Sequence, residues 1–169
     1  ISAEGNINML QRLTVHRPAR LGETLTVKGE IKSVTAVPRG QRVETDVWFE
    51  DLTGERVISC PRTSLRPQAQ ARSKSGVGDQ PQPVVGDVTS LVLRDTYQLT
   101  PDRVKSYSVE GNSIHYEQEA AERAGFRAPL IGGGMGVHYL TAQMWQDRRP
   151  SFFDASIYFR RPIFWDEAV

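Results

Sequence analysis

Three side chains that could perform acid–base chemistry lie within six residues of one another in the second half of the chain. They are the acid Glu110, the amide Asn112 and the imidazole His115. A carboxylate and an imidazole together can remove and return a proton next to a carbonyl group. Three consecutive glycines follow at positions 132–134, and a helix that begins there would offer backbone N–H groups to a developing oxyanion. These residue types predict acid–base chemistry on a carbonyl compound.

Each of these features also has a purely structural interpretation. A single histidine near a helix start commonly hydrogen-bonds its neighbours, and three glycines in a row commonly form a loop. Structural roles are also expected for His16 in a strand, His138 in a helix and the single cysteine, Cys60, in a strand. The three histidines are too scattered to predict a cluster of metal ligands.

A longer pattern connects the acid–base residues with the glycines. Its members, counted from the histidine, are Asn112, Ile114, His115, Ala121, Gly125, Phe126, Pro129, Ile131, Gly134 and Met135. This pattern resembles the signature of the MaoC-like (R)-specific enoyl-CoA hydratases and dehydratases of the hotdog superfamily. That signature reads approximately Gly-Asp-x-Asn-Pro-Ile-His, then Ala, then Gly-Phe or Gly-Tyr, then Ile-x-His-Gly-Met. Upstream, residues 13–34 and 43–67 resemble strands of the amino-terminal hotdog in two-hotdog members, so the resemblance covers most of the chain.

The resemblance implies a fold and a reaction. The fold would be an α+β hotdog, with an antiparallel sheet wrapped round a central helix, in a double-hotdog form with incomplete halves. The reaction would be reversible hydration of an enoyl thioester, or dehydration of a 3-hydroxyacyl thioester, with coenzyme A or a carrier protein on the substrate and no further cofactor. His115 and Glu110 would share the proton transfers, and Asn112 would orient the water or the acid. Gly133, Gly134 and Met135 would bind the substrate, and a backbone N–H near Gly134 would polarise the thioester carbonyl.

The chain departs from the family signature at three positions. Glu110 stands for the family aspartate, Ser113 for its proline and Gly133 for its second histidine, in a loop one residue longer. His138, one helical turn further on, is a candidate partial replacement for that second histidine. Counted forward from Tyr107, moreover, the aspartate position falls nearer Asn112 than Glu110. Whether an acid or an amide faces His115 therefore stays open.

Two other functions remain alternatives. The altered signature positions favour a catalytically weak half that binds acyl thioesters, or assembles with a partner subunit that carries the active residues. A hotdog thioesterase would share the fold but cleave the thioester, and the hydratase-like pattern around His115 argues against it.

Hydrophobic patterning predicts the elements that would position the site. Residues 7–66 alternate with a period of two, as antiparallel strands do. Further strands are expected at residues 90–100 and 154–164. Thr100 before Pro101 predicts a helix start, because threonine can cap the first N–H groups of a helix and proline fits its first turn. A short helix at 117–124 and a longer one at 135–145 complete the set.

These elements suggest three regions. Residues 1–67 would form strands of an amino-terminal hotdog, residues 68–87 a polar linker or mobile loop, and residues 88–169 a carboxy-terminal hotdog with the site. The first region lacks its central helix, and the second has only one strand after its helix. Either the chain is a fragment, or one composite hotdog uses both regions. Open sheet edges favour a homodimer or paired hotdog units.

Composition argues against several kinds of partner. The formal charge is +1 with 24% charged residues, so a nucleic-acid partner is not expected. A single cysteine excludes an internal disulfide framework and fits a reducing compartment. No apolar run approaches the roughly 20 residues that span a bilayer, and no signal-peptide pattern opens the sequence, so we expect a cytoplasmic protein without a membrane partner.

Overall fold

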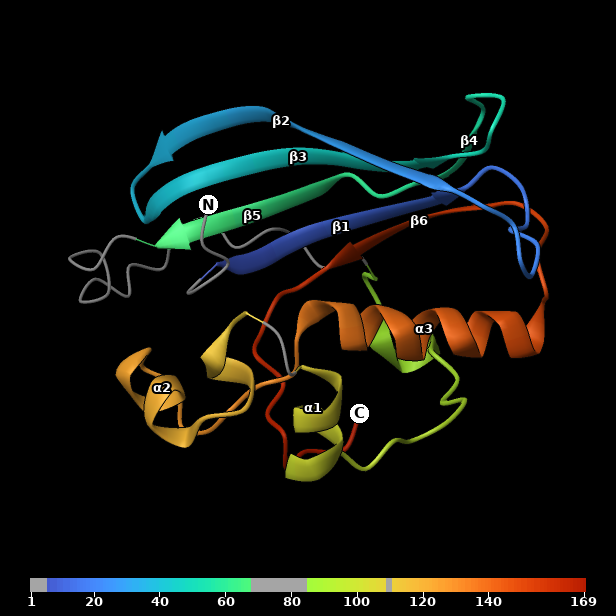
Figure 1. Cartoon of the computed structure of the whole chain (residues 1–169). Helices are drawn as coiled ribbons and strands as arrows, with labels where there is room; N and C mark the ends of the chain where they lie inside the picture. Colours follow the sequence, from blue (N-terminus) through green and yellow to red (C-terminus); the bar gives the residue numbers. More distant parts are fainter. Residues whose placement is uncertain (1–5, 68–84, 109–110) are drawn as a thin grey trace.

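The computed structural model describes residues 6–67, 85–108 and 111–169 (Figure 1). Glu110 and most of the predicted linker lie outside these ranges. The first region forms the strands β1 (Ile7–Val15), β2 (Thr26–Val37), β3 (Gly40–Glu50), β4 (Arg56–Ser59) and β5 (Arg62–Pro67). The second forms η2 (Val88–Ser90), α1 (Pro101–Tyr107), η3 (Ser113–His115), α2 (Gln118–Arg123), α3 (Gly133–Asp147) and β6 (Phe153–Tyr158).

All six strands belong to one antiparallel sheet. β4 and β5 lie end to end between β3 and β1, since each pairs with a different part of those two strands. β2 borders β3 at one edge, and β6 borders β1 at the other, in a register from Leu10 opposite Tyr158 to Val15 opposite Phe153. The described residues of both predicted regions thus build one shared sheet, which is the composite arrangement.

The predicted alternation produces the longest pairing, between β2 and β3. Residues Pro38 and Arg39 form the turn, and Gly40 at its end has a φ of 145° that favours glycine. Val27 faces Phe49 and Ile31 faces Thr45 across the pair, so apolar side chains gather on one face. β2 is the edge strand, and these two β2 side chains remain about half exposed.

Helix α3 lies across one face of the sheet (Figure 1), as the sequence predicts. Trp145 near its end packs edge-to-face against Phe153 of β6, with ring centroids 6.4 Å apart. On another side, α3 packs against α1 and the carboxy-terminal segment through a core of four buried residues. These are Leu99, Val104, Ile131 and Met135, flanked by Tyr139, Ile163, Trp165 and Val169.

The helix starts are also confirmed. Thr100 caps α1 by accepting a hydrogen bond from the Arg103 N–H at 3.3 Å, and proline follows at the first position. α2 falls within the predicted 117–124 range. Among the described residues, no helix combines the length and apolar character that crossing a membrane requires.

The predicted strand at 90–100 is wrong. Residues 91–96 form no regular element, and only Gln98 makes an isolated antiparallel bridge, to Ala168. Leu91, Val92 and Leu93 are 60%, 73% and 81% exposed, so the apolar run that suggested a strand has no ladder among the described residues. An apolar run forms a strand only where another strand edge is available to it.

Candidate active site

His115 ends the short helix η3, and its ring makes a contact with the backbone of a neighbouring loop. Nδ1 lies 2.8 Å from the carbonyl oxygen of Leu130. A carbonyl oxygen only accepts, so Nδ1 carries the hydrogen and donates it. In the neutral ring, Nε2 is then the basic nitrogen. The contact therefore sets the tautomer that a general base requires.

The acceptor of that bond is itself fixed by the surrounding loop. The N–H of Leu130 donates to the carbonyl of Ile114 at 3.3 Å, so η3 and this loop are bonded in both directions. On the other side, Ile131 N–H donates to Ile163 at 2.9 Å. Ile114 and Ile131 are both buried, which keeps water from competing for these bonds. His115 is thus positioned by the chain before and after it.

Gly132 lies beside the basic nitrogen. A Cβ built on Gly132 would stand 3.8 Å from His115 Nε2 and 3.7 Å from Ser108 Oγ. The backbone there has φ −63° and ψ 141°, which any residue can adopt, so conformation does not demand glycine. We call this place, bordered by the imidazole and the serine hydroxyl, the Gly132 position. Two polar groups thus surround a position that carries no side chain of its own.

The next two glycines allow close contacts in the first turn of α3. A Cβ on Gly133 would meet Asn8 Nδ2 at 2.7 Å and Phe159 at 3.0 Å, and one on Gly134 would meet Tyr107 Oη at 2.8 Å. The triple glycine is therefore the N-cap and first two residues of a helix, packed against the sheet on one side and α1 on the other. The N–H groups of those first two residues have no acceptor within the helix. They are candidate donors to an oxyanion.

Asn112 lies at the start of η3. It is only 7% exposed, and its carbonyl accepts the N–H of His115 at 3.2 Å. Because Glu110 lies outside the described residues, which of the two occupies the family acid position stays a prediction.

Met135 differs from its two glycine neighbours. Its side chain is 4% exposed and packs in the core, and its N–H donates to Gly132 at 2.9 Å. Substrate contact by Gly133, Gly134 and Met135 stays a prediction, and for Met135 the packing favours a supporting role.

The other titratable side chains that the sequence singled out make local contacts. His16 Nε2 lies 2.9 Å from Ser59 Oγ. His138 meets the Tyr107 ring edge-on, with centroids 5.3 Å apart. Cys60 follows β4 directly, and burial raises the pKa of its thiol, so a reactive thiolate is disfavoured.

No pattern in the sequence assigned a role to Ser108, which the structure places beside Gly132 and His115. A serine just after a helix usually only caps the helix, so the residue type did not indicate a functional role. Its position two residues before Glu110 was the one available hint.

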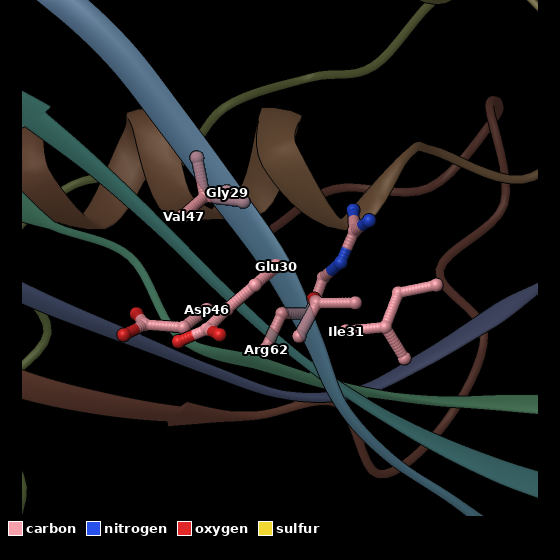
Figure 2. Close-up of a pocket in the computed structure, with 7 residues that line it drawn as sticks. Gly29, Glu30, Ile31, Asp46, Val47 and Arg62 are labelled. Atoms are coloured by element: carbon pink, nitrogen blue, oxygen red, sulfur yellow. The ribbon is translucent and has the colours of Figure 1, made fainter.

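A hollow elsewhere lacks comparable chemistry. It lies on the sheet and is lined by Gly29, Glu30, Ile31, Thr45, Asp46, Val47 and Arg62. Figure 2 shows the Glu30 and Asp46 carboxylates on one side and the Arg62 guanidinium pointing to the other. No histidine lines it. Within the described ranges, no three His, Cys, Asp or Glu side chains gather as metal ligands would.

No family model and no curated protein sequence matches the chain, but solved structures do. HtdX from Mycobacterium tuberculosis superimposes with a TM-score of 0.78 at 19% identity, over 99% of this chain and 66% of that one. A MaoC-like dehydratase from Phytophthora capsici gives 0.69 at 22%, over 97% and 60%. A Mycobacterium tuberculosis protein with a double hotdog fold gives 0.56 at 15%, over 95% and 60%. The chain thus spans between 60% and 66% of the length of these proteins. Identities this low speak for the fold alone, and by that measure the chain has the α+β hotdog fold that MaoC-like dehydratases share.

Proposed function

We propose that the chain belongs to the MaoC-like hydratases and dehydratases and adds water reversibly to an enoyl thioester. The observation that carries this proposal is the 2.8 Å bond from His115 Nδ1 to Leu130, which leaves Nε2 as the base beside the start of α3. The fold shared with proteins named MaoC-like dehydratases supports it.

In this mechanism, His115 Nε2 accepts a proton from water while the water oxygen bonds to C3 of the enoyl group. The electron pair of the C2=C3 bond moves toward C2 and the thioester oxygen, which gives an enolate. A proton delivered to C2 then completes the 3-hydroxyacyl thioester. Glu110 is the proposed donor of that proton, with Asn112 orienting the acid or the water. Dehydration runs through the same steps in reverse.

The first turn of α3 would stabilise the enolate. Gly133 and Gly134 occupy its first two positions, where N–H groups point out of the helix and the helix dipole favours negative charge. One such preorganised donor is typically worth about 3 kcal/mol in the transition state. A Cβ at either glycine would lie less than 3.0 Å from the end of a neighbouring side chain, Asn8 or Tyr107, so a larger residue would require that side chain to move.

The substrate would be a coenzyme A or carrier-protein thioester, with its acyl tail along the apolar wall between the sheet and α3. We also propose that two hotdog units pair, because within the described ranges β2 is an edge strand that pairs with another strand on one side only. Sedimentation that shows only a monomer would contradict the pairing.

A second candidate, binding of acyl thioesters without catalysis, is favoured by one specific contact. Gly133 stands where the family has its second histidine, and even a Cβ there would lie 2.7 Å from Asn8 Nδ2. A histidine at this position would therefore require the Asn8 side chain to move.

One assay separates the candidates. The full chain is incubated with short and medium trans-2-enoyl-CoA, and loss of the conjugated double bond is followed by ultraviolet absorbance beside release of free thiol. Loss of absorbance without thiol supports the hydratase, and thiol release supports a hotdog thioesterase. Binding of the thioester without either change supports the binding role. No turnover by the wild type in either direction would overturn the proposed function.

A further inference from the structure

Ser108 has an unusual environment for a hydroxyl group. The residue follows α1, and its N–H donates to the carbonyls of Val104 and Lys105. Its side chain is buried, the residue being 8% exposed, and its Oγ has no hydrogen-bond partner among the described residues. Buried hydroxyl groups are nearly always bonded, because burial without a partner destabilises the folded state. A hydroxyl left in this state calls for an explanation.

The location of Ser108 Oγ supplies one. It borders the Gly132 position at 3.7 Å, and His115 Nε2 borders the same position at 3.8 Å. Both polar atoms therefore adjoin a point that carries no side chain, at the start of α3. Serine has a single heavy-atom torsion, so its hydroxyl can turn toward a ligand there without backbone movement.

We propose that Ser108 Oγ hydrogen-bonds the oxygen atom that the reaction transfers: the attacking water in hydration, and the 3-hydroxyl group in dehydration. This inference rests on the proposed hydratase function. Ser108 forms and breaks no covalent bond. It holds the oxygen whose proton His115 removes or returns.

The chemistry of the water explains why a hydroxyl group suits this role. One hydrogen of the attacking water points to His115 Nε2, and one lone pair must point to C3 of the substrate. A second contact is needed to fix the remaining hydrogen and lone pair. A hydroxyl group can both donate and accept, whereas the N–H groups of α3 can only donate. Those donors match the thioester oxygen, which only accepts.

The test compares Ser108→Ala with wild type in hydration of crotonyl-CoA and in urea unfolding. We expect kcat to fall about tenfold to a hundredfold while KM changes little, since the variant loses a contact to water rather than to the thioester. We expect the urea midpoint to stay equal or rise, because the variant removes a buried hydroxyl that has no partner. Ser108→Cys keeps nearly the same shape with a weaker donor, and should show the same loss of kcat.

Thr45 provides a matched control. Its Oγ1 is the other buried hydroxyl without a partner among the described residues, but it lies on β3 at the hollow of Figure 2. Thr45→Val should likewise keep or raise the urea midpoint, with kcat within about twofold of wild type. The control thus isolates the effect of position from that of removing a buried hydroxyl.

The outcomes separate this inference from the function on which it rests. If wild type is active and His115→Ala is not, while Ser108→Ala keeps kcat within about twofold, the Ser108 role is overturned and the hydratase stands. A lower urea midpoint with unchanged kcat in the folded fraction would instead assign Ser108 a structural role. A wild type that neither hydrates nor dehydrates overturns both proposals.

Discussion

The sheet and the segment that carries the candidate site are held together in opposite ways. In the sheet, β3 pairs with three other strands, and β1 also pairs with three. The position of each strand therefore depends on many backbone hydrogen bonds. The described residues of the site segment, 100–108 and 111–136, form short helices joined by loops. Two of the bonds between them are the imidazole contact to Leu130 and the backbone bond between Ile114 and Leu130. A strand ladder spreads stability over many residues, whereas contacts of this kind fix the position of particular side chains.

This difference has a consequence for substitutions. Loss of buried apolar groups in the sheet should weaken folding and leave the chemistry of each folded molecule intact. A small change beside Gly132 should do the reverse, because Ser108 and His115 border a place that carries no side chain of its own. Four substitutions, taken in order of decreasing effect, test the contrast.

The largest effect is expected at His115. His115→Asn can keep a donor near the position of Nδ1, and hence the bond to Leu130, but it removes the basic Nε2. We expect the hydration rate to fall about 10³-fold, the typical range for loss of a general base. The rate is measured with a trans-2-enoyl-CoA, beside the urea midpoint. His115→Ala also loses the Leu130 bond, so it should be equally inactive and less stable. Near wild-type activity in the Asn variant would remove His115 from the mechanism.

Gly132→Ala should give the next largest effect. The added methyl group makes only ordinary contacts, at 3.7 Å and 3.8 Å from its nearest neighbours, and the backbone conformation accepts alanine. Folding should therefore be little changed, but the methyl group would occupy the place between the two polar atoms. We expect kcat/KM to fall about 10²-fold, as for loss of one well-placed interaction. Gly86→Ala, in open space, is the matched control. Equal activity of the two variants would mean that no ligand reaches the Gly132 position.

The contrast also explains how much the sequence could predict. Alternation identified the residues of β1 to β5, and Thr100 with Pro101 marked the start of α1, because these signals are local. The strand prediction at 90–100 failed because a strand partner would have had to come from elsewhere in the chain. The identity of His115 as a candidate base came from its family pattern. The tautomer of His115 could not be predicted in this way, because it depends on the carbonyl of Leu130, fifteen residues away.

The glycines show the same limit in another form. Their run suggested a helix start, which the structure confirms at Gly133. Gly133 and Gly134 lie close to side chains from two different elements, Asn8 on β1 and Tyr107 on α1, and Gly132 borders His115 on η3. No local pattern reports such contacts. Ser108 was missed on the same ground, because burial without a partner is visible only in the folded chain.

In the sheet, Val57→Ala should produce the opposite result to the glycine variant. Val57 lies on β4 and is 0% exposed. Removing two methyl groups costs roughly 0.8 kcal/mol for each, and the cavity adds to it, so the free energy of unfolding should fall by about 2 kcal/mol. Urea unfolding measures this loss, and kcat of the folded protein should remain within about twofold. A fall in kcat as large as that of Gly132→Ala would show that sheet and site are not separable.

The smallest effect should come from the ionic cluster at the end of the sheet. Arg17 Nη2 lies 2.9 Å from Asp51 and also contacts Glu23. Bonds from the Thr53 hydroxyl and Arg17 hold the pKa of Asp51 well below its usual value, and Arg17 with the Arg20 N–H lowers that of Glu23. A lowered carboxyl pKa stabilises the fold above the unfolded pKa, about 3.9 for aspartate, and this stabilisation is lost as pH falls through the folded pKa.

Asp51→Asn removes the charge but keeps an oxygen that can accept from Thr53. The variant should unfold at a slightly lower urea concentration than wild type at about pH 7, and the gap should narrow as the pH is taken below about 4. Because these ion pairs lie at the surface, the gap should be small and should shrink further in high salt. Hydratase activity should be unaffected, since the cluster lies on the turns that flank the sheet. A gap that stayed constant down to about pH 2 would mean that the turn geometry, rather than the charge of Asp51, supplies the stabilisation.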